Sequence, residues 1–205
     1  MLGDKTFLPH PEKSEEGKLA AVSIDRFDAK ALQDILDLEK AAFGEGAQYE
    51  DAEEYYGGRL GDPENLNIFL KAGEKAVGYL LAIPRSEALS DDELRDADPE
   101  FRDVSGQKAY YVETAELIES YRKGTGFLKL LIGLREECRR RNVTTVSMHA
   151  RVEGGLAAAT LRYLERISEV KEKRLIEHWP FYENDEPTMY IEAEDLTAKW
   201  GTDTD

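Results

Sequence analysis

Hydrophobic residues recur at helical spacing in several stretches of the chain. The clearest run places five apolar residues at i, i+3, i+4, i+7 and i+11, and its members are Phe127, Leu130, Leu131, Leu134 and Cys138. Such spacing gives a helix one continuous apolar face. Similar patterns predict helices over Ala31–Phe43, Ala52–Leu60 and Leu156–Ile167. Asp28 is placed to cap the first of these, and Gly44 and Gly46 are placed to stop it.

Runs rich in β-branched and aromatic residues predict strands between these helices. The predicted strands are Leu19–Ile24, Asn67–Lys71, Ala76–Ile83, Tyr110–Ile118, Thr144–His149, Lys173–Trp179 and Thr188–Glu192. The short polar link from Ala72 to Lys75 is typical of a hairpin. This order of elements predicts an α/β fold with a single mixed, mostly antiparallel central sheet and helices on both faces.

The composition is that of one folded domain. The chain has 205 residues, of which 41% are hydrophobic and 34% charged, enough for a substantial core. We expect a flexible N-terminal arm over 1–17, a domain over 18–195 and a C-terminal tail over 196–205. The N-terminus is polar without a signal-peptide core, and no stretch approaches the roughly 20 apolar residues of a membrane span. We therefore expect a cytoplasmic protein without a membrane partner.

The charge balance favours cationic partners. The chain has 27 basic and 43 acidic residues and a net charge of −16, which argues against nucleic acid as a partner. An acidic excursion over 86–107 carries all eight of its acids between Glu87 and Asp103. It is interpreted as a solvated surface loop that favours solubility, with substrate capture as the alternative.

Cysteine and histidine give no sign of a metal site. Cys138 is the only cysteine, so the chain can form no internal disulfide, and its place on an apolar helix face predicts a buried structural thiol. His10, His149 and His178 are scattered along the sequence. His149 ends a predicted strand and is interpreted as structural rather than catalytic.

The most informative stretch is a strand, a glycine-bearing loop and a helix in direct succession. Gly124 and Gly126 allow close backbone approach, and Arg122 and Lys123 add positive charge where a helix N-terminus already favours an anion. This order predicts a phosphate-bearing cofactor, with an ordinary turn as the alternative. Lys129 stands where a dinucleotide fingerprint needs its third glycine, and the sequence contains no Walker motif.

From about Leu19 to Glu194 the chain resembles the GNAT superfamily of acyl-CoA-dependent N-acetyltransferases. The family's fourth strand leads into an Arg/Gln-x-x-Gly-x-Gly/Ala loop, whose two glycines match Gly124 and Gly126. The helix motif Asn-x-x-Ala-x-x-x-Tyr matches at Ala159 and Tyr163, while Leu156 replaces its Asn. The segment Phe181–Met189 is similar to the family's last hairpin, with an aromatic pair, an acidic turn and a Met-bearing strand.

The resemblance implies that acetyl-CoA is the cofactor and that its pyrophosphate lies on the loop. Tyr121 stands at the first motif position in place of Arg or Gln, which leaves Arg122 as the stand-in. Backbone N–H groups around Leu117 and Ile118 would bind the pantetheine arm. The implied cofactor-binding residues are Leu117, Ile118, Tyr121, Arg122, Lys123, Gly124, Thr125 and Gly126.

Two residues are the candidates for proton transfer. Glu113 lies where some members of the family carry a basic carboxylate, and its alternative role is that of an exposed or paired strand glutamate. Glu116 and Glu119 could substitute, although strict alternation sends Glu113 and Glu116 to opposite faces unless a bulge intervenes. Tyr163 is the candidate general acid for the departing thiolate, with a packed core tyrosine as the alternative.

The function implied is transfer of an acetyl or other acyl group from acyl-CoA to a primary amine by direct attack in a ternary complex. The acceptor is expected to be a small-molecule or peptide amine, favoured as cationic by the net charge, and the expectation allows for a homodimer. Two alternatives remain: a catalytically idle GNAT-fold binding or regulatory protein, and a mononucleotide-binding α/β protein.

Overall fold

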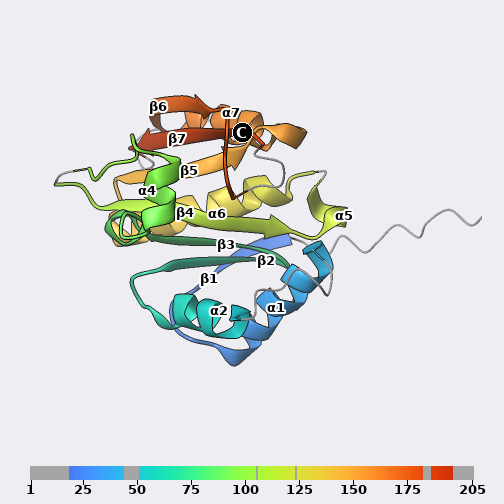
Figure 1. Ribbon diagram of the computed structural model, residues 1–205. Helices are drawn as coiled ribbons and strands as arrows, with labels where there is room; N and C mark the ends of the chain where they lie inside the picture. The colour runs from blue at the N-terminus through green and yellow to red at the C-terminus, as the bar shows by residue number, and fades with distance from the viewer. Residues whose placement is uncertain (1–18, 44–50, 105, 123, 182–185, 196–205) are drawn as a thin grey trace, which may run out of the picture.

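The computed structural model describes residues 19–43, 51–104, 106–122, 124–181 and 186–195. The expected arm over 1–17, the tail over 196–205, Lys123 and the helix-stopping Gly44 and Gly46 lie outside these residues. The described chain folds around one seven-stranded sheet with the strand order β1-β2-β3-β4-β5-β7-β6 (Figure 1). Only β4 and β5 pair in parallel, so the predicted mixed, mostly antiparallel sheet is confirmed.

Six of the seven strands lie within two residues of their predicted ends. The strands are β1 (Leu19–Ile24), β2 (Leu66–Ala72), β3 (Lys75–Pro84), β4 (Ala109–Leu117), β5 (Thr145–Arg151), β6 (Glu169–Ile176) and β7 (Thr188–Glu194). β2 and β3 form the predicted hairpin, and Gly73 takes the positive φ of 61° that its turn requires.

The four predicted helices are present, and shorter helices join them. The helices are α1 (Ala29–Phe43), α2 (Ala52–Gly61), α3 (Arg85–Ala88), α4 (Asp92–Ala97), α5 (Glu119–Arg122), α6 (Gly126–Arg141) and α7 (Leu156–Ile167), with a 3-10 turn η1 (Glu153–Gly155) before α7. Asp28 caps α1 as expected, because its carboxylate accepts the Lys30 N–H at 2.8 Å.

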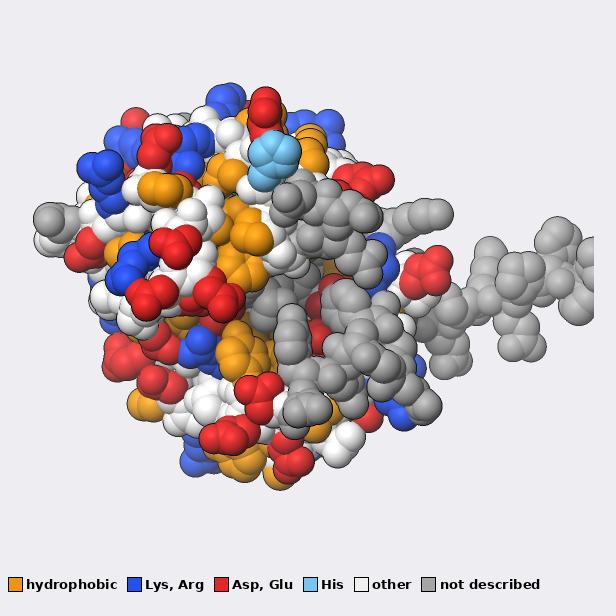
Figure 2. Space-filling model, in the orientation of Figure 1, with side chains coloured by type: hydrophobic (Ala, Val, Ile, Leu, Met, Phe, Trp, Pro, Cys, Tyr) orange, Lys and Arg blue, Asp and Glu red, His pale blue; other side chains and the backbone are white. Residues whose placement is uncertain are grey.

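The acidic excursion is not a simple solvated loop. It contains α3 and α4, and its residues Leu94 and Phe101 are buried in a cluster with Tyr111, Trp179 and Tyr190. Acidic side chains do gather over α4 and α2 on the face seen in Figure 2, with basic ones interspersed. The segment therefore combines an acidic surface with apolar anchors that fix it to the sheet.

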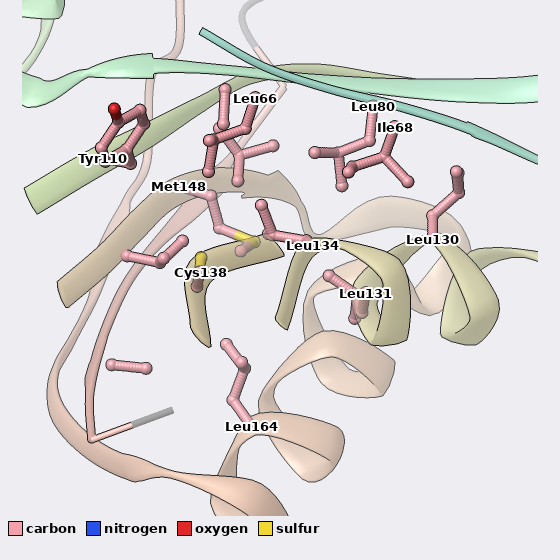
Figure 3. Close-up of a cluster of buried hydrophobic side chains, with 14 of the residues drawn as sticks. Leu66, Ile68, Leu80, Tyr110, Leu130, Leu131, Leu134, Cys138, Met148 and Leu164 are labelled. Carbon is pink, nitrogen blue, oxygen red and sulfur yellow. The ribbon is translucent and has the colours of Figure 1, made fainter. Parts of the chain in front are cut away.

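Helices cover both faces of the sheet. α6 and α7 pack on one face, where apolar residues from the strands meet the predicted apolar face of α6 (Figure 3). Gly133 allows α6 to lie close, because a Cβ there would be 2.7 Å from both Ala21 and Ile68. α1 and α2 pack on the other face against Phe69, Tyr79 and Leu81.

The predicted strand Lys173–Trp179 was placed too late in the chain. β6 spans Glu169–Ile176, and its residues alternate between exposed and half-buried. As an edge strand it pairs only with β7, so charged residues occupy positions that a central strand would fill with apolar ones. Trp179 lies beyond the strand and is buried in the same cluster as Leu94 of α4.

β4 has two irregularities that matter for the site. Leu81 pairs with Thr114 and Ala82 with Val112, which leaves Glu113 as the extra residue of a β-bulge. On its other side β4 pairs with β5 only from Ala109 to Val112, although both strands continue beyond that point. The two central strands therefore stop pairing at the residue before Glu113.

Candidate active site

Residues 121–126 (the glycine loop) run from the end of α5 to the first residue of α6, a 16-residue helix, and residue 123 among them lies outside the described residues. Thr125 is the N-cap of α6, and its side chain makes no capping hydrogen bond. The first N–H groups of α6 therefore receive no partner from that side chain, and the helix dipole favours an anion beside them. The phosphate site at this loop stays a prediction.

The two glycines of the loop differ in their surroundings. A Cβ on buried Gly126 would lie 2.7 Å from the carbonyl oxygen of Tyr121 and 3.4 Å from the Leu117 side chain, so only glycine fits there. A Cβ on exposed Gly124 would meet nothing within 4 Å. Packing explains Gly126, whereas Gly124 leaves open backbone of the kind a ligand can approach.

Arg122 does not extend from the loop but folds back onto the end of β4. Its Nε donates to the Leu117 carbonyl at 2.8 Å, and its Nη2 donates to Glu116 Oε1 at 2.7 Å. The same Glu116 oxygen accepts the Leu117 N–H at 3.0 Å. This pair, the Glu116–Arg122 clasp, occupies both backbone hydrogen-bonding groups of Leu117.

The backbone around Leu117 and Ile118 is therefore not open in this state. The Ile118 N–H donates to the Val77 carbonyl at 3.1 Å, which extends the pairing of β4 with β3. Only the Leu117 groups are held by side chains, and side chains can move aside more readily than a sheet ladder. A pantetheine arm bound at Leu117 would have to replace the clasp.

Glu113 lies on the face that carries α1 and α2. Its Oε1 accepts from Arg59 Nη2 of α2 at 2.6 Å, while its buried Oε2 has no hydrogen-bond partner among the described residues. The other Arg59 nitrogen, Nη1, bonds to Glu87 of α3. Burial lowers the pKa of Arg59, but the Glu113 carboxylate and the Tyr55 hydroxyl outweigh burial and leave this pKa raised.

The bulge also decides where Glu116 lies. Ala115 and Leu117 pack against the core beneath α6, so Glu116 between them faces the α1 side, where its charge acts on Glu39. Glu113 and Glu116 therefore share a face, as the sequence allowed only if a bulge intervened. Burial raises the pKa of Glu39, a hydrogen bond from Tyr79 opposes that effect, and the charge of Glu116 adds to the rise.

Tyr163 lies on the opposite face of the sheet, where it packs against the core between α6 and α7. Its hydroxyl is buried and has no hydrogen-bond partner among the described residues. Burial raises the pKa of this hydroxyl to about 12, with a smaller lowering by Arg135 and a raising by Glu136. The phenol therefore stays protonated across the physiological range.

His149 belongs to a buried chain of hydrogen bonds (the His149 chain) that links Tyr111, His149, Asp98 and Arg174. Its Nε2 lies 2.9 Å from Asp98 Oδ2 and its Nδ1 lies 3.0 Å from the Tyr111 hydroxyl, while Arg174 holds Asp98 with two bonds of 2.7 and 2.8 Å. The ring stacks on Trp179 at 4.2 Å between centroids. The side chains of His149 and Asp98 are each only 1% exposed.

The protonation states of this chain follow from its bonds. Burial would raise the pKa of Asp98, but hydrogen bonds from His149 and Arg174 outweigh burial and hold that pKa well below its usual range. Burial lowers the pKa of His149 despite the pull of Asp98. An ionised Asp98 can only accept, so we infer that a neutral His149 carries its proton on Nε2 and accepts the Tyr111 proton at Nδ1.

The sequence pointed to Glu113 as a candidate base and to His149 as a structural histidine, but it did not show their partners. Arg59, Asp98 and Arg174 come from distant segments, and nothing in their local sequence shows which acid or base they meet.

Cys138 is buried as expected, and burial raises the pKa of its thiol to about 12. The described residues contain no cluster of His, Cys, Asp and Glu that could hold a metal ion and no helix long and apolar enough to cross a membrane.

Comparison of the amino-acid sequence with known families and curated proteins finds no match. Similarity becomes visible only when folds are compared.

Solved acetyltransferase structures align over most of the chain. The NatC complex bound to Gag peptide and CoA matches with a TM-score of 0.58 and 14% identity, covering 86% of this chain and 98% of that one. Arabidopsis thaliana NAA60 in complex with acetyl-CoA matches with a TM-score of 0.55, 14% identity and coverage of 86% and 98%. The aminoglycoside 6'-N-acetyltransferase from Enterococcus faecium matches with a TM-score of 0.55, 14% identity and coverage of 84% and 94%. Across nearly its whole described length, the chain therefore has the GNAT fold and is similar in structure to GNAT acetyltransferases.

Proposed function

We propose that this protein is an N-acyltransferase that moves an acetyl group from acetyl-CoA to a primary amine. The observation that carries the proposal is the glycine loop at a helix N-terminus without a side-chain cap from Thr125, which follows β4 after the point where β4 and β5 stop pairing. Of the three structural neighbours named above, two were solved with CoA or acetyl-CoA. The fold alone would not fix the chemistry, so the proposal depends on the site.

The residues of the glycine loop fit a pyrophosphate. Open backbone at Gly124 and the first N–H groups of α6 would bind its oxygens, and Tyr121 and Thr125 would flank them. At the end of β4, the Leu117 groups would receive the pantetheine arm once the Glu116–Arg122 clasp opens, with Ile118 beside them. Arg122, released from Glu116, would then add its charge to the phosphate site. Acetyl-CoA, when bound, supplies an acetyl thioester as the acyl donor.

The proton transfers are proposed for Glu113 and Tyr163. An amine is protonated near neutral pH and must lose a proton before it can attack, and Glu113 Oε2 is a carboxylate oxygen without a partner among the described residues. The Tyr163 hydroxyl keeps its proton and has no hydrogen-bond partner among those residues either. It could therefore donate that proton to the departing thiolate. Glu113 and Tyr163 lie on opposite faces of the sheet. They would therefore act on the same reactants at the place where β4 and β5 no longer pair.

A second proton acceptor is supported by the His149 chain. Because Tyr111 donates to His149 Nδ1, a proton accepted by its oxygen from an amine would let its own proton pass to the imidazole. Tyr111 precedes Glu113 by two residues on β4. Glu113→Gln, Tyr111→Phe and His149→Gln, compared at several pH values, would show which route deprotonates the acceptor.

The acceptor is proposed to be cationic. The net charge of −16 favours amines that carry further positive charge. Among the structural neighbours, one is an aminoglycoside acetyltransferase and another was solved with a peptide. Both kinds of amine therefore belong in a first panel.

Binding and transfer can be tested separately. CoA at 100 times its Kd should stabilise the fold by about 2.7 kcal/mol, which raises the Tm of a chain of this size by roughly 5–10 °C. Thiol release from acetyl-CoA should then be measured with spermidine, kanamycin, lysine and a peptide with a free N-terminus. No thermal shift at millimolar CoA would remove the proposal.

The alternative is a catalytically idle GNAT-fold binding or regulatory protein. It is favoured by the Glu116–Arg122 clasp, which occupies the backbone groups of Leu117, and by Leu156 at the place of the family's Asn. CoA binding without acetyl transfer to any amine in the panel would support this alternative.

A further inference from the structure

Arg59 lies between two carboxylates that the sequence places far apart. Its Nη2 is 2.6 Å from Glu113 Oε1, and its Nη1 bonds to Glu87, which are 54 and 28 residues away along the chain. Its guanidinium also lies over the Tyr55 ring, 5.1 Å from the centroid. One planar cation thus joins α2, α3 and β4.

The contacts fix the orientation of the Glu113 carboxylate. Glu113 is the extra residue of the bulge, so the sheet gives its side chain no cross-strand neighbour directly opposite. Arg59 donates a hydrogen bond to its Oε1, and the Tyr55 hydroxyl also interacts with this carboxylate. Its Oε2 has no hydrogen-bond partner within bonding distance among the described residues. Both side chains are about four-fifths buried, at 21% and 19% exposure, so water screens the pair weakly.

Glu87 holds Arg59 in turn. A guanidinium bonded only to Glu113 could rotate with it, whereas one bonded at both ends has its plane fixed by two elements of the fold. Glu87 lies in the acidic excursion, so its bond to Arg59 gives one acid of that segment a role in the site. An oriented base loses less freedom on reaching the transition state.

We propose that Arg59, braced by Glu87, is a positioning residue that fixes the Glu113 carboxylate so that Oε2 faces the acceptor amine. This inference rests on the proposed acyl transfer with Glu113 as its base. Arg59 acts through Glu113 and has no direct contact with the reacting atoms. Its loss should therefore change turnover only as long as Glu113 is present.

The test is a double-mutant cycle with acetyl-CoA and the fastest amine of the panel. Arg59→Met should lower kcat about tenfold or more, with the KM for acetyl-CoA unchanged, and Arg59→Lys should recover part of the loss. In the Glu113→Gln background, Arg59→Met should change kcat less than twofold. Arg95→Met, which removes an exposed arginine paired with Asp92, is the matched control and should leave kcat unchanged.

Several outcomes would overturn the inference. Independent, multiplicative losses in the double variant would mean that Arg59 does not act through Glu113, and a loss confined to Tm or to acetyl-CoA binding would make it structural only. If Arg59→Met fails to fold, the same cycle with Glu87→Gln decides, since that variant keeps the Arg59–Glu113 pair and should lower kcat a few-fold only when Glu113 is present. A wild-type chain that acetylates no amine would overturn the proposed function, and this inference with it.

Discussion

Arg122 Nη2 lies 2.7 Å from Glu116 Oε1, and the two side chains together hold both the N–H and the carbonyl of Leu117. In the proposed complex the same backbone groups receive the pantetheine arm. The clasp therefore competes with the cofactor for Leu117. Binding of CoA has to include the cost of opening it.

Glu116→Ala should strengthen CoA binding. Removing the carboxylate frees the Leu117 N–H and releases Arg122 toward the phosphates, a gain of about 1 kcal/mol or roughly fivefold in Kd. Titration calorimetry with CoA measures the change. Glu119→Ala removes the same charge from an exposed neighbour, so an equal gain there would assign the effect to charge alone.

Gly126→Ala and Gly124→Ala should have opposite consequences. At position 126 the added methyl meets the Tyr121 carbonyl at 2.7 Å, and such overpacking costs about 1–3 kcal/mol of unfolding free energy. At position 124 it meets nothing within 4 Å, so stability should hold while CoA affinity falls. Urea unfolding and CoA titration separate the two, and intact CoA binding by Gly124→Ala would count against the loop as the phosphate site.

Tyr163→Phe should slow turnover without weakening the fold. The hydroxyl is buried without a partner among the described residues, so its removal should leave unfolding free energy unchanged or raise it by about 1 kcal/mol. Tyr190→Phe is the contrast, because the Tyr190 hydroxyl donates to Glu192 at 2.6 Å and its loss should cost about 1–3 kcal/mol. Unchanged kcat in Tyr163→Phe would leave Tyr163 a packing residue.

The His149 chain predicts a loss of stability in mild acid. Burial lowers the pKa of His149, and the nearby positive charges of Arg174 and Arg85 lower it further, although Asp98 opposes them. The unfolded chain therefore binds more protons than the folded one as pH falls below about 6.5, and stability declines until the folded pKa is passed.

Urea unfolding at pH 7.5 and 5.5 tests this prediction. The wild type should lose more stability than His149→Gln, by up to about 1.4 kcal/mol per pH unit within the window. His178→Gln, which changes an exposed histidine, is the control and should follow the wild type. Parallel curves for wild type and His149→Gln would contradict the assigned state of His149.

Hydrophobic spacing along the chain predicted the helices and strands because the same spacing gives each of them its apolar face. The apolar spacing from Phe127 to Cys138 required a buried helix face, and Leu130 and Cys138 are fully buried there. β6 was placed wrongly because an edge strand can alternate charged residues, which resembles a loop in sequence. The acidic excursion was interpreted from its charge, and its buried Leu94 and Phe101 were too few to reveal α4.

The sequence by itself determined the order of the strands and of the four longer helices, because hydrophobic periodicity marks each of them. It also determined where the glycine loop lies along the chain, because Gly124 and Gly126 stand between a strand pattern and a helix pattern. Only the tertiary structure decided what the site residues meet. The bulge that turns Glu113 and Glu116 to one face, the Arg59–Glu113 pair and the bond from Asp98 to His149 depend on sheet register and on contacts across 51 and 54 residues of sequence. Such contacts are set by packing of whole elements, and no local sequence pattern encodes them.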